Sequence, residues 1–381
     1  MQLLIEQSSL ASAMSTVGRI VPRRPVTPVV STVHLSASAA EGRLRVRATD
    51  LQNYADIVLA AQVHLDGQAA VDARYLHRIA ATLSGDQIAL SLSQSGESLR
   101  ITAGSAAFRL RTVDADEFPV QRVPQGVHSS LKTDTLIDLI ERTTFCARDA
   151  EDEVSPFAGV LVALEGEQLA ISATDGYQLA HYRVKTELPP AGEDGRREAV
   201  VPTHGLSALT RALATLGGET ADLLWHDRSL WCRSGAVTWR LRQLDLKYPN
   251  LSRYTGPLAG NRIEVGKEQL LGALRQVATI ADDGRAVGLR VDGARLHLFA
   301  SHREVGEAQA VIPLAEERPP CEVWLDAERL VRSVRAQPER QVALYISEPL
   351  APVVLAPASG AVAYRTVLTP LRYYVPEADV V

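Results

Sequence analysis

Two aspartates, Asp50 and Asp175, are the residues whose type and spacing come closest to catalytic chemistry. Two carboxylates that a fold brings together can act as a general acid and a general base. Each aspartate, however, follows an Ala-Thr pair at the end of a run in which apolar and polar residues alternate, a pattern typical of a half-buried strand. Because the two aspartates end equivalent strands in separate copies of one phrase, we predict that they build turns rather than catalyse a reaction.

Other catalytic and metal-binding motifs are absent from the sequence. It has no glycine-rich phosphate loop, no His-Glu-x-x-His and no Gly-x-Ser-x-Gly. The nine histidines neither pair at i, i+4 nor lie near cysteines, so no metal site is predicted. Cys146, Cys232 and Cys321 are far apart, which fits a reducing compartment and argues against a disulfide framework. We therefore predict a protein that is not an enzyme and needs no cofactor.

The phrase that ends at the two aspartates occurs three times along the chain. Its leucines, Leu44, Leu169 and Leu296, fall 125 and 127 residues apart. A repeat of this length indicates whole domains, since the units of a solenoid are only a few dozen residues long. The three predicted domains cover residues 1–127, 128–260 and 261–381.

Each predicted domain contains two stretches whose apolar residues recur at helical spacing. Asp72, Thr203 and Asp326 open three of these stretches and are good N-cap residue types. The six predicted helices cover about residues 8–19, 72–83, 132–147, 203–216, 267–281 and 326–336.

The second copy of the phrase also predicts a hairpin. Gly176 accepts a positive φ at little steric cost, so Asp175-Gly176 is typical of a tight turn. The returning strand is predicted from Gln178 to Val184. The predicted fold class is therefore α+β, with two helices packed on antiparallel sheets in each of the three domains.

Charge is distributed unevenly in this mildly acidic chain. The net charge is −5 and the hydrophobic content is 46%, so binding to nucleic acid would require cations gathered on one surface. Two helical stretches carry an arginine and no acid, namely 8–20 with Arg19 and 205–216 with Arg211. No apolar run approaches 18 residues and the first residues do not form a signal peptide, so the prediction is a cytoplasmic protein.

Three further stretches carry a resemblance to a known family. They are Ala173-Thr174-Asp175-Gly176 followed by Leu179, Leu244-Asp245 before Tyr248-Pro249, and the ending Thr369-Pro370-Leu371-Arg372. With the threefold repeat, their order and spacing resemble the bacterial sliding clamps, the DNA polymerase III beta subunits. The resemblance covers essentially the whole chain.

The resemblance implies a fold and a mechanism. Two protomers of three clamp domains would join head to tail into a ring, with the helices lining the hole and duplex DNA threaded through it without sequence readout. The ring would act as a processivity factor. The replicative DNA polymerase, the clamp loader and repair proteins would bind through short linear motifs in a cleft between the second and third domains.

Site residues follow from the resemblance position by position. The implied DNA contacts are Arg24, Arg78, Arg148, Arg211 and Arg332. The implied dimer contacts are Phe108 and Leu110 on the first domain's edge strand, facing Ile280 and Ala281 on a helix of the third domain. The implied peptide cleft comprises Thr174, Gly176, Tyr177, Leu179, Pro249, Arg253, Tyr254, Val367, Leu368, Pro370, Leu371 and Arg372.

The chain also departs from the family pattern. Tyr177-Gln178 stands where the family commonly has His-Arg, Leu371 stands in place of a methionine, and the acidic segment 149–153 replaces aromatic DNA contacts. The chain continues past the usual family end, and this tail, Tyr374–Val381, could lie over the cleft. Two alternatives stay open, a specialised second copy of the clamp and a monomeric, non-ring scaffold that binds peptides.

Overall fold

The computed structural model describes residues 1–22, 27–148, 155, 157–187, 196–281, 286–302 and 304–372. Strands dominate this part of the chain, and the pairings between them are antiparallel. The chain divides into two compact units. The first unit contains Met1–Ile140, Ala163–Leu169 and Lys185–Asp245, and the second contains Glu141–Val162, Ala170–Val184 and Leu246–Val381.

All six predicted helices are present, although three of them end two to four residues earlier than expected. Gly18 follows the first helix and donates its N–H to the Met14 carbonyl. Residues Ala278–Ile280, which follow the helix that begins at Lys267, form only turns. The helices are α1 (Gln7–Val17), α2 (Ala73–Thr82), α3 (Thr133–Thr144), α4 (Thr203–Leu216), the short α5 (Ser252–Thr255), α6 (Lys267–Val277) and α7 (Ala327–Ala336), with 3-10 turns at η1 (Pro28–Ser31) and η2 (Ala115–Glu117).

Two of the three predicted N-caps are confirmed. Asp72 accepts the backbone N–H groups of Arg74 and Tyr75, and Asp326 accepts that of Arg329 at 2.8 Å. The prediction for Thr203 is wrong, because it is the first residue of α4 and Pro202 holds the cap position. Its hydroxyl oxygen is buried without a hydrogen-bond partner among the described residues.

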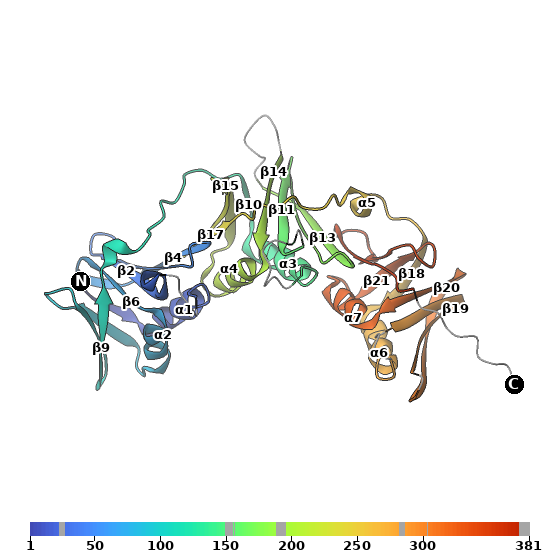
Figure 1. Cartoon of the computed structure of the whole chain (residues 1–381), viewed down its shortest axis with the longest axis horizontal. Coiled ribbons are helices and arrows are strands. Elements are labelled where there is room, and N and C mark those ends of the chain that lie inside the picture. The colour runs from blue at the N-terminus through green and yellow to red at the C-terminus, as the bar shows by residue number, and fades with distance from the viewer. Residues whose placement is uncertain are drawn as a thin grey trace. The chain divides into compact units, whose positions relative to one another are not determined.

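The first unit is built on one long antiparallel sheet. Its order is β10-β15-β16-β17-β4-β3-β2-β6-β9-β8-β7-β1-β5, and α1 contacts both α2 and α4 beside it (Figure 1). The strands are β1 (Gln2–Glu6), β2 (Thr32–Ser38), β3 (Arg43–Thr49), β4 (Asn53–Ala60), β5 (Gln62–Leu65), β6 (Gly67–Asp72), β7 (Gln87–Leu92), β8 (Ser98–Ala103), β9 (Ala106–Val113), β10 (Ser129–Lys132), β15 (Thr220–His226), β16 (Ser229–Ser234) and β17 (Val237–Arg242). The pairing of β17 with β4 joins two of the sequence repeats in one sheet.

The second unit repeats this join with other strands. Here β13 pairs with β23, and the sheet continues through β22 and β21 to β18. A long hairpin of β19 and β20 forms a separate two-stranded sheet. The strands are β13 (Gln178–Lys185), β18 (Asn261–Gly266), β19 (Ala286–His302), β20 (Gly306–Asp326), β21 (Gln341–Ile346), β22 (Val353–Pro357) and β23 (Tyr364–Leu368), and the remaining strands of the chain are β11 (Gly159–Glu165), β12 (Gln168–Thr174) and β14 (Arg196–Pro202).

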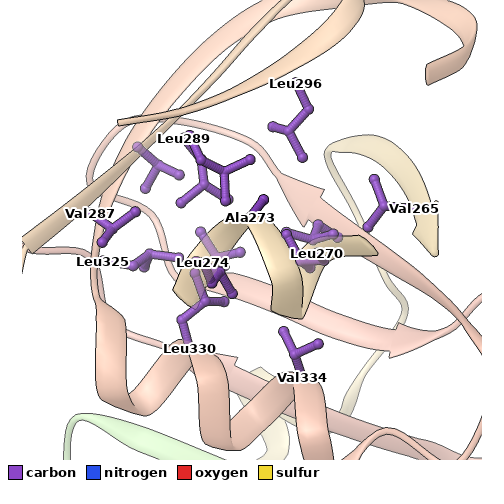
Figure 2. Packing of buried hydrophobic residues seen from close by; sticks show 14 of the residues in the cluster. Val265, Leu270, Ala273, Leu274, Val287, Leu289, Leu296, Leu325, Leu330 and Val334 are labelled. Atoms are coloured by element: carbon purple, nitrogen blue, oxygen red, sulfur yellow. The ribbon is translucent and has the colours of Figure 1, made fainter. Parts of the chain in front are cut away.

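An aliphatic core fixes α6 and α7 in the second unit. Leu270 and Leu274 on α6, and Leu330 and Val334 on α7, recur every four residues, so each pair lies on one helix face. Figure 2 shows these side chains gathered with strand residues such as Leu289. Each buried leucine contributes about 1.5–3 kcal/mol through the area it removes from water. This packing sets where the first turn of α7 lies.

The residues expected to join two protomers lie on a strand edge and after a helix. Phe108 is 38% exposed on β9, whose pairing with β6 is confined to its last two residues. The expected place of Ile280 and Ala281 on a helix is wrong, since α6 ends at Val277 and both residues follow it. The Ile280 N–H still bonds to the Val277 carbonyl, because the chain continues as a tighter turn.

Candidate functional site

The turn between β12 and β13 is held by its own side chains. One Asp175 carboxylate oxygen accepts the backbone N–H groups of Tyr177 and Gln178, each at 2.8 Å. The Thr174 hydroxyl donates to the Gln178 carbonyl at 2.6 Å. Gly176 adopts a φ of 93°, in the left-handed region that favours glycine. The prediction that Asp175 serves a turn is therefore confirmed.

Arg329 on α7 supports this turn from outside. Its guanidinium lies 3.6 Å from an Asp175 carboxylate oxygen and 4.9 Å from the centre of the Tyr177 ring. Tyr177 is nevertheless 58% exposed. The turn thus presents an aromatic ring to solvent while a cation holds that ring in place.

A pocket of about 210 Å³ opens beside the turn, within the second unit. Leu179 and Val367 are paired across β13 and β23 and form part of its apolar wall. The lining residues are Phe157, Thr174, Gly176, Tyr177, Gln178, Leu179, Pro249, Asn250, Leu251, Tyr254, Pro352, Val367 and Thr369. None of these side chains is charged, so the pocket suits an apolar side chain.

The segment around Pro249 is fastened at two points. The Arg365 guanidinium donates to the backbone carbonyls of Tyr254, at 3.3 Å, and Gly256, at 2.5 Å. The Tyr248 hydroxyl donates to the Ser172 carbonyl at 3.2 Å, and burial raises the pKa of Tyr248 above its usual value. These bonds hold the segment that carries Pro249 and Tyr254 against the pocket.

Seven of the twelve predicted cleft residues line this one pocket. The other five lie elsewhere in the second unit: Arg253 is exposed on α5, Leu368 is part of the core, and Pro370 is buried. Leu371 and Arg372 line a second, more open hollow of about 740 Å³ that also contains Trp324 and Leu350. The predicted cleft therefore corresponds to two hollows.

Several lining residues were not predicted from the sequence. Gln178, Asn250 and Leu251 adjoin predicted residues, so extending each predicted segment by one or two positions would have found them. Phe157 and Pro352 come from distant stretches that carry no recognisable signal. Only the folded chain brings them to the pocket.

The arginines predicted to contact DNA have different surroundings. Arg78 on α2 and Arg211 on α4 are exposed, and so is Arg148 just after α3. Arg332 lies 3.9 Å from Glu328 one turn earlier on α7, which leaves it partly neutralised. Arg24 lies outside the described residues, as does the acidic segment 149–153.

A polar groove of about 570 Å³ runs between α1, α2 and α4 of the first unit. Arg19, His77 and Arg211 line it together with small side chains such as Ser12 and Ser15. None of its lining residues is acidic. Arg19 and His77 were not among the predicted DNA contacts, although the acid-free sequence of residues 8–20 was a signal for the former.

Two searches were made of the residues that the structure describes. No group of three or more histidine, cysteine, aspartate or glutamate side chains among them is arranged to hold a metal ion. None of the helices in this part of the chain is long and apolar enough to cross a membrane. What the described geometry offers is surface for binding: an uncharged pocket in the second unit and an acid-free helix groove in the first.

Comparison with known proteins gives the family. Residues 1–122 match the N-terminal domain of the DNA polymerase III beta subunit, and residues 130–250 match its central domain. The beta sliding clamp of Synechococcus elongatus is 30% identical over 362 residues, covering 94% of this chain and 96% of the relative. That of Caulobacter vibrioides is also 30% identical, covering 98% and 100%. The structure of Caulobacter crescentus pol III beta superimposes with a TM-score of 0.86 at 27% identity, covering 98% of this chain and 100% of that one.

The chain therefore belongs to the DNA polymerase III beta subunit family, the bacterial beta sliding clamps. It is a DNA sliding clamp, a processivity factor that works with DNA and a DNA polymerase and is not itself a catalyst. The family assignment confirms the fold class and the function that the sequence predicts.

Proposed function

We propose that this chain forms a head-to-tail homodimer that encircles duplex DNA in the cytoplasm, and that partner proteins dock by inserting a short peptide into the pocket beside Tyr177. The observation that carries the proposal is the pocket itself. It is apolar, uncharged and bounded by two strands and a fastened loop. The replicative DNA polymerase, the clamp loader and repair proteins are the proposed partners.

The size of the pocket supports a side-chain anchor as its occupant. A dry protein cavity of about 150 Å³ accommodates a benzene-sized molecule. The pocket here measures about 210 Å³, which suffices for one large apolar side chain. Burying such an anchor yields roughly 25 cal/mol per Å² before the entropic costs of ordering the peptide. Micromolar affinity is the expected outcome for a short peptide.

The helix groove of the first unit supports the DNA role. Its arginines, Arg19 and Arg211, and the exposed Arg78 on α2 are suited to phosphate oxygens. Contacts of this kind position DNA without reading its sequence, and they weaken steeply as salt rises. We include Arg24, Arg148 and Arg332 in the proposed contact set on the resemblance alone.

Ring closure would use the open edge of β9. Phe108 is exposed there and Leu110 is partly exposed, and an unpaired apolar strand edge is an aggregation hazard unless a partner covers it. We propose that Ile280 and Ala281 of a second copy cover it, with the chain organised in the three domains 1–127, 128–260 and 261–381. A monomeric peptide-binding scaffold is the alternative, and a specialised second clamp remains compatible with the same site.

One experiment tests the pocket. The probe is a fluorescein-labelled peptide with a bulky apolar residue near a glutamine, followed by anisotropy. Leu179→Ala should weaken its binding by about 1–3 kcal/mol, as truncating a buried anchor contact does. Leu371→Ala is the matched control, because Leu371 lines the second hollow and only a longer peptide should detect its loss. Unchanged affinity in Leu179→Ala would show that the peptide binds elsewhere.

A second experiment tests the ring. Light scattering should give twice the 41.2 kDa mass of the chain at micromolar concentration. Ile280→Asp should give the single mass, because it would bury an unpaired charge against β9. A wild-type mass equal to one chain would favour the monomeric scaffold.

A further inference from the structure

The apolar wall of the pocket continues at one end into a charged surface. Leu179 on β13 and Val367 on β23 are paired with one another and line the pocket. Two positions away on each strand, His181 is paired with Arg365 in the same register. Side chains alternate between the two faces of a sheet, so the second pair lies on the same face as the first. This face therefore changes from apolar to cationic within about 7 Å, the length of two strand residues.

A second arginine joins Arg365 on this surface. The Arg183 N–H bonds to the Ala363 carbonyl, so Arg183 on β13 lies diagonally across from Arg365 on β23. Side chains in diagonal positions have Cβ atoms about 7 Å apart, which is within reach of long side chains. Arg183 is exposed and Arg365 is half-buried. Burial, followed by the nearby charge of Arg183, lowers the pKa of Arg365 from its ordinary value.

No carboxylate compensates these two charges in the part of the chain that the structure describes. Neither Arg183 nor Arg365 forms an ion pair there, whereas Lys185, the next cation along β13, pairs with Glu167 at 3.0 Å. The bonds from Arg365 to two backbone carbonyls both come from one guanidinium nitrogen, Nη1. Its Nε and Nη2 have no acceptor among the described residues. The two arginines thus form a cationic pair that lacks a counter-charge.

We propose that Arg183 and Arg365 bind an acidic residue of the partner peptide, beside the apolar anchor that the pocket holds. The inference rests on the proposed peptide-binding function. Charge complementarity supports it, because a guanidinium donates to a carboxylate through charge-assisted hydrogen bonds that are stronger than neutral ones. An extended peptide advances about 3.3 Å per residue, so the acidic residue should lie two or three positions from the anchor.

The small size of the cationic pair favours a peptide over a nucleic acid as its occupant. Proteins that bind single-stranded nucleic acid follow the backbone with a positively charged groove and stack the bases on aromatic side chains. Here two arginines adjoin an uncharged pocket of about 210 Å³, which suits one apolar side chain followed by one carboxylate.

The test compares fluorescein-labelled peptides by anisotropy. All carry the same bulky apolar anchor, and two of them carry glutamates at the second and third positions from it, on the N-terminal side in one peptide and on the C-terminal side in the other. Each acidic peptide has a counterpart with glutamines in place of the glutamates. The wild-type protein should bind one acidic peptide about two- to fivefold more tightly than its counterpart, as expected for a partly exposed ion pair. This ratio should fall toward one as salt is raised, because salt screens exposed charges.

Substitutions of the two arginines should change the ratio in a graded way. Arg183→Gln should bring it close to one, and Arg183→Glu should bring it below one, because like charges then meet. Arg365→Met should lower the ratio and also weaken both peptides, since it removes the bonds to the Tyr254 and Gly256 carbonyls as well. Arg335→Gln is the matched control, because it removes the same charge from an exposed position near the end of α7 and should leave the ratio unchanged.

The ratio also separates recognition of the acid from a general structural defect. A partly unfolded variant loses binding of acidic and neutral peptides equally, so its ratio stays at the wild-type value. Equal wild-type affinity for each acidic peptide and its counterpart overturns the inference but leaves the peptide-binding function standing.

Two further outcomes would also overturn the inference. One is a preference that survives in Arg183→Gln, because it assigns the acid to another residue. The other is an unchanged peptide ratio in Arg183→Gln together with weaker binding of a labelled single-stranded oligonucleotide, because it assigns the arginines to nucleic acid. Failure of the wild-type protein to bind any of the peptides overturns the proposed function and this inference with it.

Discussion

The turn after β3 and the turn after β12 share one set of hydrogen bonds. In the first turn the Asp50 carboxylate accepts the Gln52 N–H at 2.8 Å, and the Thr49 hydroxyl donates to the Asn53 carbonyl at 2.6 Å. In the second turn Asp175 and Thr174 make the equivalent bonds. Each turn also accepts an equivalent backbone bond from the chain beside it, since the Arg242 N–H bonds to the Gln52 carbonyl and the Thr369 N–H bonds to the Tyr177 carbonyl.

The two turns differ in what a nearby helix, α4 for the first turn and α7 for the second, contributes to each of them. The third residue of α4 is Gly205, which packs so closely that a Cβ there would lie 2.6 Å from the Asn53 side-chain oxygen. The third residue of α7 is Arg329, which reaches the second turn through its long side chain. The first turn is therefore packed directly against its helix, while the second keeps an exposed tyrosine beside a pocket. The same set of turn hydrogen bonds therefore occurs in two different surroundings, one against a close-packed helix and one beside an open pocket.

The largest difference in stability should come from one pair of equivalent strand positions. Asp56 on β4 is buried and lies 3.0 Å from Arg45 and 3.2 Å from Arg47. The equivalent His181 on β13 bonds to the Ser172 hydroxyl at 2.9 Å. Asp56→Asn should lower the free energy of unfolding by about 2–4 kcal/mol, because it leaves the half-buried arginines without their counter-charge.

His181→Asn is the matched change and should cost only about 1 kcal/mol, since a single neutral hydrogen bond is lost. Urea unfolding followed by circular dichroism measures both variants. Equal losses in the two would mean that the buried ion pairs contribute no more than the neutral contact.

The close approach of α4 should appear in a second pair of variants. Gly205→Ala forces a Cβ against Asn53 and Leu241 and should destabilise the protein by about 1–3 kcal/mol without weakening peptide binding. Gly176→Ala meets Phe157 only at 3.4 Å, so its cost of about 1–2 kcal/mol comes from the positive φ. Only Gly176→Ala should also weaken peptide binding, as measured by anisotropy. Loss of binding in Gly205→Ala would contradict the distinction between the two turns.

His181 should also make the protein sensitive to acid. Burial, followed by the nearby charges of Arg365 and Arg183, lowers the pKa of His181 to about 4 from an ordinary value of 6.5. The unfolded chain therefore binds more protons than the folded one between these two values. The stabilisation is fully present above pH 6.5 and is lost as the pH falls to about 4.

The expected loss across this pH range is about 3 kcal/mol, because each pH unit between the two pKa values contributes about 1.4 kcal/mol. Thermal unfolding at intervals between pH 7 and pH 4 measures it, and His181→Gln should flatten the decline. An equally steep decline in His181→Gln would assign the acid sensitivity to other groups.

The sequence predicted best those features that depend on local periodicity. The six helices and the Asp175-Gly176 hairpin follow from apolar spacing and turn chemistry, and the structure contains all of them. The ends of the helices were harder to predict from the sequence. The chain changes to tighter turns after α1, α3 and α6, and no proline in those last residues marks where each helix stops. Thr203 was a suitable cap residue type, but the register of β14 with α4 puts Pro202 in that position.

The candidate site was predicted only in part, for a physical reason. Leu179 and Val367 meet because β13 pairs with β23, a contact between residues far apart in the chain that no local pattern reveals. The resemblance supplied those residues, whereas Phe157 and Pro352 enter the pocket through tertiary packing alone. The support of Tyr177 by Arg329 likewise depends on where the core places α7. The tail Tyr374–Val381 lies outside the described residues, and its predicted cover over the cleft stays a prediction.

Hydrogen–deuterium exchange with and without a saturating peptide distinguishes the two turns, because it reads both of them in one sample. Peptide binding in the pocket should slow exchange at the backbone amides of residues 176–179 and 367–369. Exchange at residues 51–54 should not change, because the equivalent turn there is packed against α4. Protection at residues 51–54 without protection at 176–179 would show that the peptide binds at the first turn and not at the second.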